Sequence, residues 1–142
     1  MRSTERFTGL ANIYGQARPT YPPDLVRWCL EQAPAPAIVD LGCGTGISTR
    51  LFASTGHPVI GIDPNADMLA TARAEGAQDY RVGTSEHTGL PDACTDLIIA
   101  AQAFHWFHLD RTFAEVERIG TPRSACVAFW NVRLEETPFI WL

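Results

Sequence analysis

The stretch Val39–Gly46, VDLGCGTG, places three glycines at alternate positions after an acidic residue. The residues before it, 37–39, are apolar and indicate the end of a buried strand. The residues after it, 47–54, have apolar side chains four positions apart and predict a helix. A glycine-rich turn between a strand and a helix lets a ligand approach the main chain closely. The stretch therefore predicts a ligand-binding turn.

Apolar strand patterns alternate with helical patterns along the rest of the chain. Strands are predicted at 37–41, 58–63, 79–84, 96–101 and 124–131, and helices at 25–33, 47–54, 66–76 and 109–120. Residues 85–95 predict a loop where a further helix would be expected. This alternation favours an α/β fold with a doubly wound, mainly parallel, Rossmann-like sheet of about five strands.

Two of the predicted helices carry an apolar face. In the helix at 25–33, Trp28 lies on this face and is expected in the core. In the helix at 109–120, the residues expected to face the sheet are Leu109, Phe113 and Val116. Asn65 is expected to cap the helix at 66–76.

Composition limits the class of protein. The chain has 142 residues, about the length of one domain, and 46% of them are hydrophobic. The formal net charge of −5 gives no basic surface for a nucleic acid. The N-terminus is polar and no apolar run approaches the roughly 20 residues that span a membrane. The four cysteines have no paired spacing, so we expect neither a metal site nor disulfides, and a cytoplasmic location.

Two familiar phosphate-binding patterns fit the glycine turn poorly. A nicotinamide site favours G-x-G-x-x-G, whereas the spacing here is G-x-G-x-G, with Asp40 before the first glycine. A P-loop requires Lys followed by Ser or Thr after the last glycine, but Ile47 and Ser48 occupy those positions.

VDLGCGTG instead resembles the first motif of class I S-adenosylmethionine-dependent methyltransferases. Two further segments resemble this family: GIDPN, in which Asp63 closes the second strand, and VGTSEHTGLP, which leads into the loop after the third. AQAFHWF, at the fourth strand, resembles a motif of small-molecule methyltransferases similar to trans-aconitate methyltransferase. The N-terminal YGQARPTYPPDL resembles the cover of the same group. The resemblance implies that S-adenosyl-L-methionine is the cofactor and that its methyl group passes to a small-molecule acceptor by in-line displacement.

The resemblance assigns roles to the first two motifs. Gly42, Gly44 and Gly46 would lie under the methionyl part of the cofactor, and Asp40 would receive its ammonium group. An alternative for Asp40 is a structural hydrogen bond to the loop backbone. Asp63, 21 positions after Gly42, would accept hydrogen bonds from the ribose hydroxyls, the alternative being a helix cap.

The adenine is expected to contact the segment after the third strand. The family usually carries Asp where this chain has Thr84, and a hydroxyl accepts only a weaker, neutral hydrogen bond. Ser85 would offer its main-chain N–H, and Glu86 a nearby carboxylate. Pro64 would pack on the adenine ring.

Residues from the two remaining segments would complete the site. Gln102 and His105 follow the fourth strand, at the edge where ligands bind in open α/β sheets. His105 would be the general base if the acceptor must lose a proton; otherwise it forms part of the wall. Tyr14, Arg18 and Tyr21 resemble a lid over the cofactor, the alternative being a solvated arm.

The domain division follows from these assignments. Residues 1–36 are expected to form the lid and a helix, and residues 37–142 the cofactor-binding core, truncated after the fifth strand. The fifth strand, predicted without proline or charge, would be an open edge where a second copy could pair to form a homodimer. The alternative to an active enzyme is a cofactor-binding module, or an inactive fragment, of the same fold.

Overall fold

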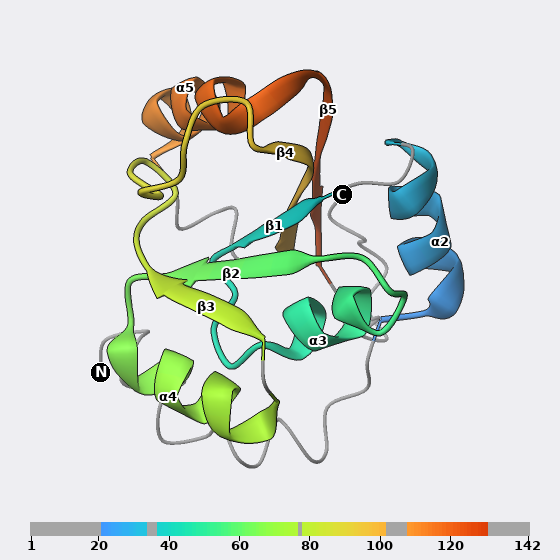
Figure 1. Ribbon diagram of the computed structural model, residues 1–142, viewed down its shortest axis with the longest axis vertical. Coiled ribbons are helices and arrows are strands. Elements are labelled where there is room, and N and C mark those ends of the chain that lie inside the picture. Colours follow the sequence, from blue (N-terminus) through green and yellow to red (C-terminus); the bar gives the residue numbers. More distant parts are fainter. Residues whose placement is uncertain (1–20, 34–36, 77, 102–107, 131–142) are drawn as a thin grey trace, which may run out of the picture.

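The computed structural model describes residues 21–33, 37–76, 78–101 and 108–130. Helices and strands alternate through these residues, as the sequence predicts (Figure 1). Their bounds are α2 (Pro23–Glu31), β1 (Ile38–Leu41), α3 (Ile47–Ala53), β2 (Val59–Asp63), α4 (Ala66–Glu75), β3 (Asp79–Val82), β4 (Thr95–Ala101), α5 (Leu109–Ile119) and β5 (Gly120–Phe129). Among the described helices, none is both long and apolar enough to cross a membrane.

The strands form one parallel sheet in the order β3-β2-β1-β4-β5. The strand order reverses between β1 and β4, and ligands bind at the carboxyl ends of strands beside such a reversal. The register places Asp40 of β1 opposite Gly61 of β2, and Gly61 opposite Tyr80 of β3. The predicted doubly wound sheet of five strands is therefore confirmed.

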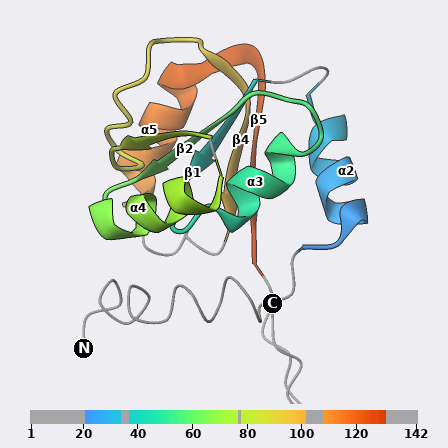
Figure 2. The same cartoon turned by 60° about the horizontal axis from the view of Figure 1, so that its bottom comes forward.

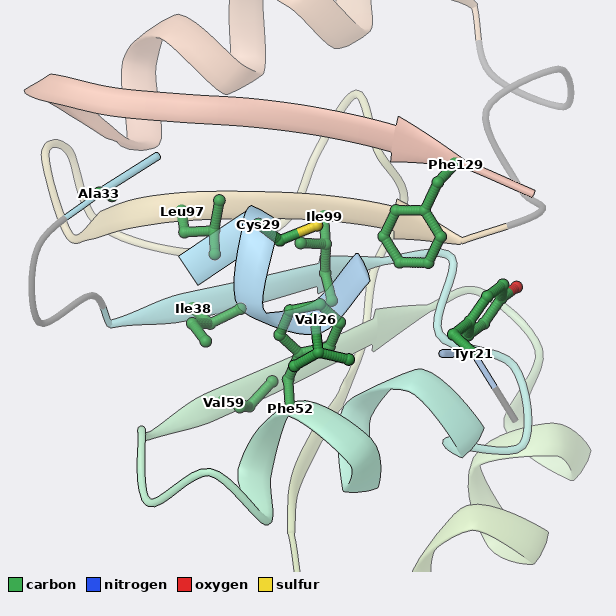
Figure 3. Packing of buried hydrophobic residues seen from close by; sticks show 10 residues of the cluster. All are labelled: Tyr21, Val26, Cys29, Ala33, Ile38, Phe52, Val59, Leu97, Ile99 and Phe129. Atoms are coloured by element: carbon green, nitrogen blue, oxygen red, sulfur yellow. The ribbon is translucent and has the colours of Figure 1, made fainter. Parts of the chain in front are cut away.

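Helices cover both faces of the sheet, with α2, α3 and α4 on one face and α5 on the other (Figure 2). Successive residues of a strand point to opposite faces, so β1 contributes Ile38 to the first face and Val39 to the second. The cluster on the first face is shown in Figure 3; it contains Tyr21, Val26, Cys29, Ala33, Ile38, Phe52, Val59, Leu97, Ile99 and Phe129. A second cluster joins the sheet to α5 and the loop before β4.

The expectation that Trp28 lies in the core was wrong. The side chain is 51% exposed, whereas Val26 and Cys29 of the same helix are buried in the first cluster. Helix α2 therefore turns a face defined by Val26, Cys29 and the following Ala33 toward the sheet, and Trp28 lies outside this face.

The inner face of α5 also differs from the prediction. Leu109 and Phe113 are 46% and 50% exposed, and Val116 is partly buried. Two polar residues, Thr112 and Glu115, are buried instead, together with Ile119. Hydrophobic periodicity alone gave the wrong face because the loop before β4 offers polar partners to this helix.

The last described strand begins four residues earlier than expected. Strand β5 starts at Gly120, directly after α5, and therefore includes Pro122 and Arg123. The prediction of a strand without proline or charge was wrong. Proline is tolerated in a strand that forms a sheet edge, and β5 stands last in the strand order. Residues 85–94 contain no helix, which confirms the predicted loop.

Candidate functional site

The turn after β1 has the geometry that three glycines permit. Gly42, Gly44 and Gly46 have φ angles of 69°, 55° and 85°, a region that favours glycine. A side chain at Gly46 would also collide with the Tyr80 hydroxyl, and its Cβ would lie 2.9 Å from Nη1 of Arg50. Glycine is therefore favoured at all three positions by the backbone conformation, and at Gly46 also by the lack of space for a side chain.

Asp40 lies under this turn and is completely buried. Its Oδ2 accepts hydrogen bonds from Ser48 Oγ at 2.6 Å and from Thr49 Oγ1 at 2.7 Å. The sequence suggested a bond to the loop backbone, but the donors are two hydroxyls from the first turn of α3. These two donors could have been found from the sequence, because Ser48 and Thr49 follow Asp40 by eight and nine positions.

The second oxygen of Asp40, Oδ1, is buried and has no hydrogen-bond partner among the described residues. Burial raises the pKa of Asp40 to about 6, the hydroxyl bonds oppose this change, and the nearby charge of Asp63 adds to it. A buried oxygen of this kind favours a ligand that brings a hydrogen-bond donor or a positive charge.

Asp63 ends β2, the strand beside β1, and is 8% exposed. Its Oδ2 accepts the main-chain N–H of Gly44 at 2.9 Å, and Oδ1 accepts that of Asn65 at 2.8 Å. Burial raises its pKa, although both N–H groups oppose the change. Asp63 thus ties the end of β2 to the glycine turn.

The cap of α4 is Asn65, as the sequence predicts. Its Oδ1 accepts the main-chain N–H groups of Asp67 and Met68 at 3.0 and 3.1 Å. The alternative that Asp63 caps this helix was therefore wrong. Pro64, expected beside the adenine, is exposed at the same edge of the sheet.

The loop after β3 places the three expected adenine contacts in different surroundings. Thr84 Oγ1 accepts the main-chain N–H of His87 at 3.0 Å. Ser85 is buried, and its hydroxyl lies 2.9 Å from that of Thr112 on α5. Oε1 of Glu86 accepts the main-chain N–H of His108, at the start of α5, at 3.0 Å. A contact between the Glu86 carboxylate and the adenine stays a prediction.

Four of the expected site residues, Tyr14, Arg18, Gln102 and His105, lie outside the described residues. Tyr21 is described, and its ring is buried at 4.8 Å, centroid to centroid, from the ring of Phe129 (Figure 3). The alternative of a solvated arm does not hold for Tyr21, because this residue belongs to the first core cluster. A contact between Tyr21 and a cofactor stays a prediction.

Comparison with known proteins gives a family for this arrangement. Residues 39–128 match the family described as "Methyltransferase domain". An uncharacterized methyltransferase of Mycobacterium tuberculosis is 35% identical over 135 residues, which cover 94% of this chain and 55% of the relative. The chain thus spans about half the length of the curated relatives it matches.

Solved structures agree with this match. A protein of Anaeromyxobacter dehalogenans assigned as a type II methyltransferase has a TM-score of 0.72 and 40% identity, covering 80% of this chain and 48% of its own. An S-adenosylmethionine-dependent methyltransferase of Mesorhizobium loti has a TM-score of 0.61 and 32% identity, covering 70% and 48%. With the Rossmann-like sheet, the glycine turn and the two buried carboxylates, these similarities show that the chain belongs to the class I S-adenosylmethionine-dependent methyltransferase family.

Proposed function

We propose that this chain binds S-adenosyl-L-methionine at the carboxyl edge of the sheet and takes part in methyl transfer to a small-molecule acceptor. The observation that carries the proposal is the pair of buried carboxylates at the ends of adjacent strands. Asp40 and Asp63 are 0% and 8% exposed, and Oδ1 of Asp40 has no partner among the described residues. Carboxylates are rarely buried unless they are paired or bind a ligand.

The donor groups of the cofactor fit these acceptors. Each oxygen of Asp63 accepts one main-chain N–H bond, and a carboxylate oxygen can accept about two, so both can also accept ribose hydroxyls. The unpartnered Oδ1 of Asp40 suits the ammonium group, directly or through water. The turn that contains Gly42, Gly44 and Gly46 would lie under the methionyl part.

The adenine would contact the loop after β3. Thr84 Oγ1 has a second lone pair for the amino group, and the main-chain N–H of Ser85 would meet the ring. Pro64 is exposed beside Asp63 and would pack on the ring. When bound, the cofactor supplies the reactive methyl group on its sulfonium, and the protein orients the acceptor and excludes water.

The acceptor is proposed to be a small molecule. The net charge of −5 supports this proposal over a nucleic acid, because phosphate groups are bound by basic surfaces. Gln102 and His105 would line the acceptor side, and His105 would act as base for acceptors that must lose a proton.

We also propose a cytoplasmic location and pairing of two copies through the edge of β5.

The second candidate is a cofactor-binding module of the same fold without turnover. The length of the chain, about half that of its curated relatives, favours this candidate for the chain on its own. Incubation with methyl-labelled cofactor and a panel of small carboxylates, phenols and amines separates the two. Label in a small product supports the enzyme. Binding without any labelled product supports the module.

The cofactor itself is tested by calorimetry with S-adenosylhomocysteine and NAD. We expect S-adenosylhomocysteine to bind at one site per chain, and NAD to give no heat of binding. Tighter binding of NAD would contradict the proposal.

A further inference from the structure

The loop from Gly83 to Cys94 is held against α5 along its whole length, although it contains no helix or strand. Near its start, the hydroxyl of Ser85 contacts that of Thr112, and Oε1 of Glu86 accepts the N–H of His108. At its end, the N–H groups of Ala93 and Cys94 donate to the carbonyls of Arg118 and Ile119 at 2.9 and 2.7 Å. The middle of the loop is held by a buried carboxylate.

This carboxylate belongs to Glu115, whose side chain is 7% exposed. Its Oε2 accepts the main-chain N–H of Thr88 at 2.7 Å and the Thr88 hydroxyl at 2.8 Å. Arg118 donates from Nε to Oε1 at 2.7 Å and from Nη2 to Oε2 at 3.0 Å. Thr88, Glu115 and Arg118 are called the Glu115 network below.

The Glu115 network extends into the main chain of the loop. Nη2 of Arg118 also donates to the carbonyl of Leu90 at 2.7 Å, and the Thr88 hydroxyl accepts the N–H of Leu90 at 3.1 Å. The Arg118 hydrogen bonds lower the pKa of Glu115 to about 2; burial opposes the shift and the Thr88 bonds add to it. Glu115 therefore stays ionised, and paired with Arg118, throughout the neutral pH range.

The Glu115 network lies close in the loop to the residues that are expected to contact the adenine. The loop doubles back on itself, so that a Cβ at Gly83 would lie 3.0 Å from the carbonyl oxygen of Thr88. The N–H of Gly83 donates to the carbonyl of Asp63 at 3.2 Å. Thr84 and Ser85 thus lie between an attachment to Asp63 on one side and an attachment to α5 on the other.

We propose that Glu115 is a positioning residue for the adenine ring: through Thr88 and Arg118 it fixes the loop that presents Thr84 and the main-chain N–H of Ser85. This inference rests on the proposed cofactor. A well-packed apolar residue could replace a buried ion pair at little cost in stability, so stability alone gives no reason for a carboxylate here. A carboxylate does supply what an apolar residue lacks, an acceptor for the N–H and hydroxyl of Thr88.

The test compares two ligands that differ only in the base, S-adenosylhomocysteine and S-inosylhomocysteine. Hypoxanthine presents an oxygen in place of the adenine amino group and a ring N–H in place of an acceptor. The contact with the main-chain N–H of Ser85 is therefore reversed, because two donors would face each other, whereas the Thr84 hydroxyl can donate to the oxygen. A loop fixed for adenine should bind the inosyl compound at least about tenfold more weakly, because unpaired polar groups are costly at a buried contact.

The variants are Glu115→Gln and Thr88→Val, with Glu117→Gln as matched control on an exposed position of the same helix. We expect the dissociation constant of S-inosylhomocysteine, divided by that of S-adenosylhomocysteine, to fall about three- to tenfold in both test variants. The reason is that each variant loses one or two hydrogen bonds of the network. The ratio should stay unchanged in Glu117→Gln and return to the original value in Thr88→Ser, which keeps the hydroxyl.

The ratio separates positioning from stability. A variant that only unfolds part of the protein weakens both ligands by the same factor and leaves the ratio unchanged. That result in Glu115→Gln and in Thr88→Val would overturn the inference. If the unaltered chain binds neither ligand, the proposed cofactor itself is contradicted, and the inference that rests on it falls with it.

Discussion

The turn after β1 and the loop after β3 lie at the same edge of the sheet but are held in place by different contacts. The turn is fixed by residues close in sequence and by the neighbouring strand: Ser48 and Thr49 bind Asp40, and Asp63 binds Gly44. The loop is fixed by α5, through a contact between residues 27 positions apart, Thr88 and Glu115. The carboxylate under the turn takes its donors from residues eight and nine positions away, whereas the loop depends on a helix 27 positions away.

The largest expected effect tests how tightly the turn is specified. Gly46→Ala places a Cβ at a φ of 85° against the Tyr80 hydroxyl and Arg50. We expect it to lower the free energy of unfolding by roughly 2–5 kcal/mol, from backbone strain together with overpacking. Urea denaturation followed by circular dichroism measures this change.

Gly56→Ala is the matched control for Gly46→Ala. Gly56 has a φ of 90°, but a Cβ there would meet no atom within 4 Å. It should therefore show only the backbone strain, about 1–2 kcal/mol. Equal losses in the two variants would mean that the packing against Tyr80 contributes nothing to the specification of the turn.

The same contrast decides how much could be predicted from sequence. The alternating strands and helices, the glycine turn and the Asn65 cap follow from spacing along the chain, and the structure has them. The Glu115 network could not be predicted, because nothing local distinguishes Glu115 from its exposed neighbour Glu117. Leu109 and Phe113 were placed on the wrong face for the same reason, since the buried positions of α5 are chosen by the loop that packs on it.

The next effect concerns the pH dependence of stability. Burial raises the pKa of Asp40 to about 6, so between pH 4 and 6 the folded state holds this proton more tightly than the unfolded state. Stability from this group is greatest below pH 4 and falls as the pH rises to 6. The fall should be about 3 kcal/mol, because one pKa unit corresponds to about 1.4 kcal/mol.

In Asp40→Asn, most of this decrease in the free energy of unfolding should disappear. Urea denaturation at a series of pH values from 4 to 8 measures the change. Asp63, whose pKa is also raised, remains in the variant and contributes in the same direction. Glu115, whose pKa is lowered from 4.5 to about 2, acts in the opposite direction between these two pH values, but it is present in both proteins and cancels in the comparison. An identical pH profile for the two proteins would show that folding does not raise the pKa of Asp40.

A third prediction concerns Asp63, whose carboxylate accepts the N–H of Gly44 in the turn and whose main-chain carbonyl accepts that of Gly83 in the loop. Asp63→Asn should weaken the binding of S-adenosylhomocysteine by about 1.5–3 kcal/mol, the value of a hydrogen bond to a charged group. Calorimetry measures the change. Asp67→Asn, at an exposed position in the first turn of α4, should leave the affinity unchanged. Small and equal effects in both variants would show that Asp63 serves only to hold the Gly44 and Asn65 main chain.

The smallest expected effect lies at the rim of the loop. Asp92 pairs with Arg118 at 2.6 Å, but the Asp92 side chain is 79% exposed. Asp92→Asn should change the free energy of unfolding by less than about 1 kcal/mol, as is usual for solvent-exposed ion pairs. A loss in Asp92→Asn as large as that in Glu115→Gln would mean that the exposed pair, and not the buried carboxylate, fixes the loop.

The proposed binding site is tested most directly by titrating the chain with S-adenosylhomocysteine and following the main-chain amide resonances in NMR spectra. We predict that the amides of Gly44 and Gly46 in the turn, and of Thr84 and Ser85 in the loop, shift together with one dissociation constant. Amides of α2, on the far side of the first core cluster, should keep their positions. Shifts confined to the turn, or shifts produced by NAD and not by S-adenosylhomocysteine, would contradict the proposed site.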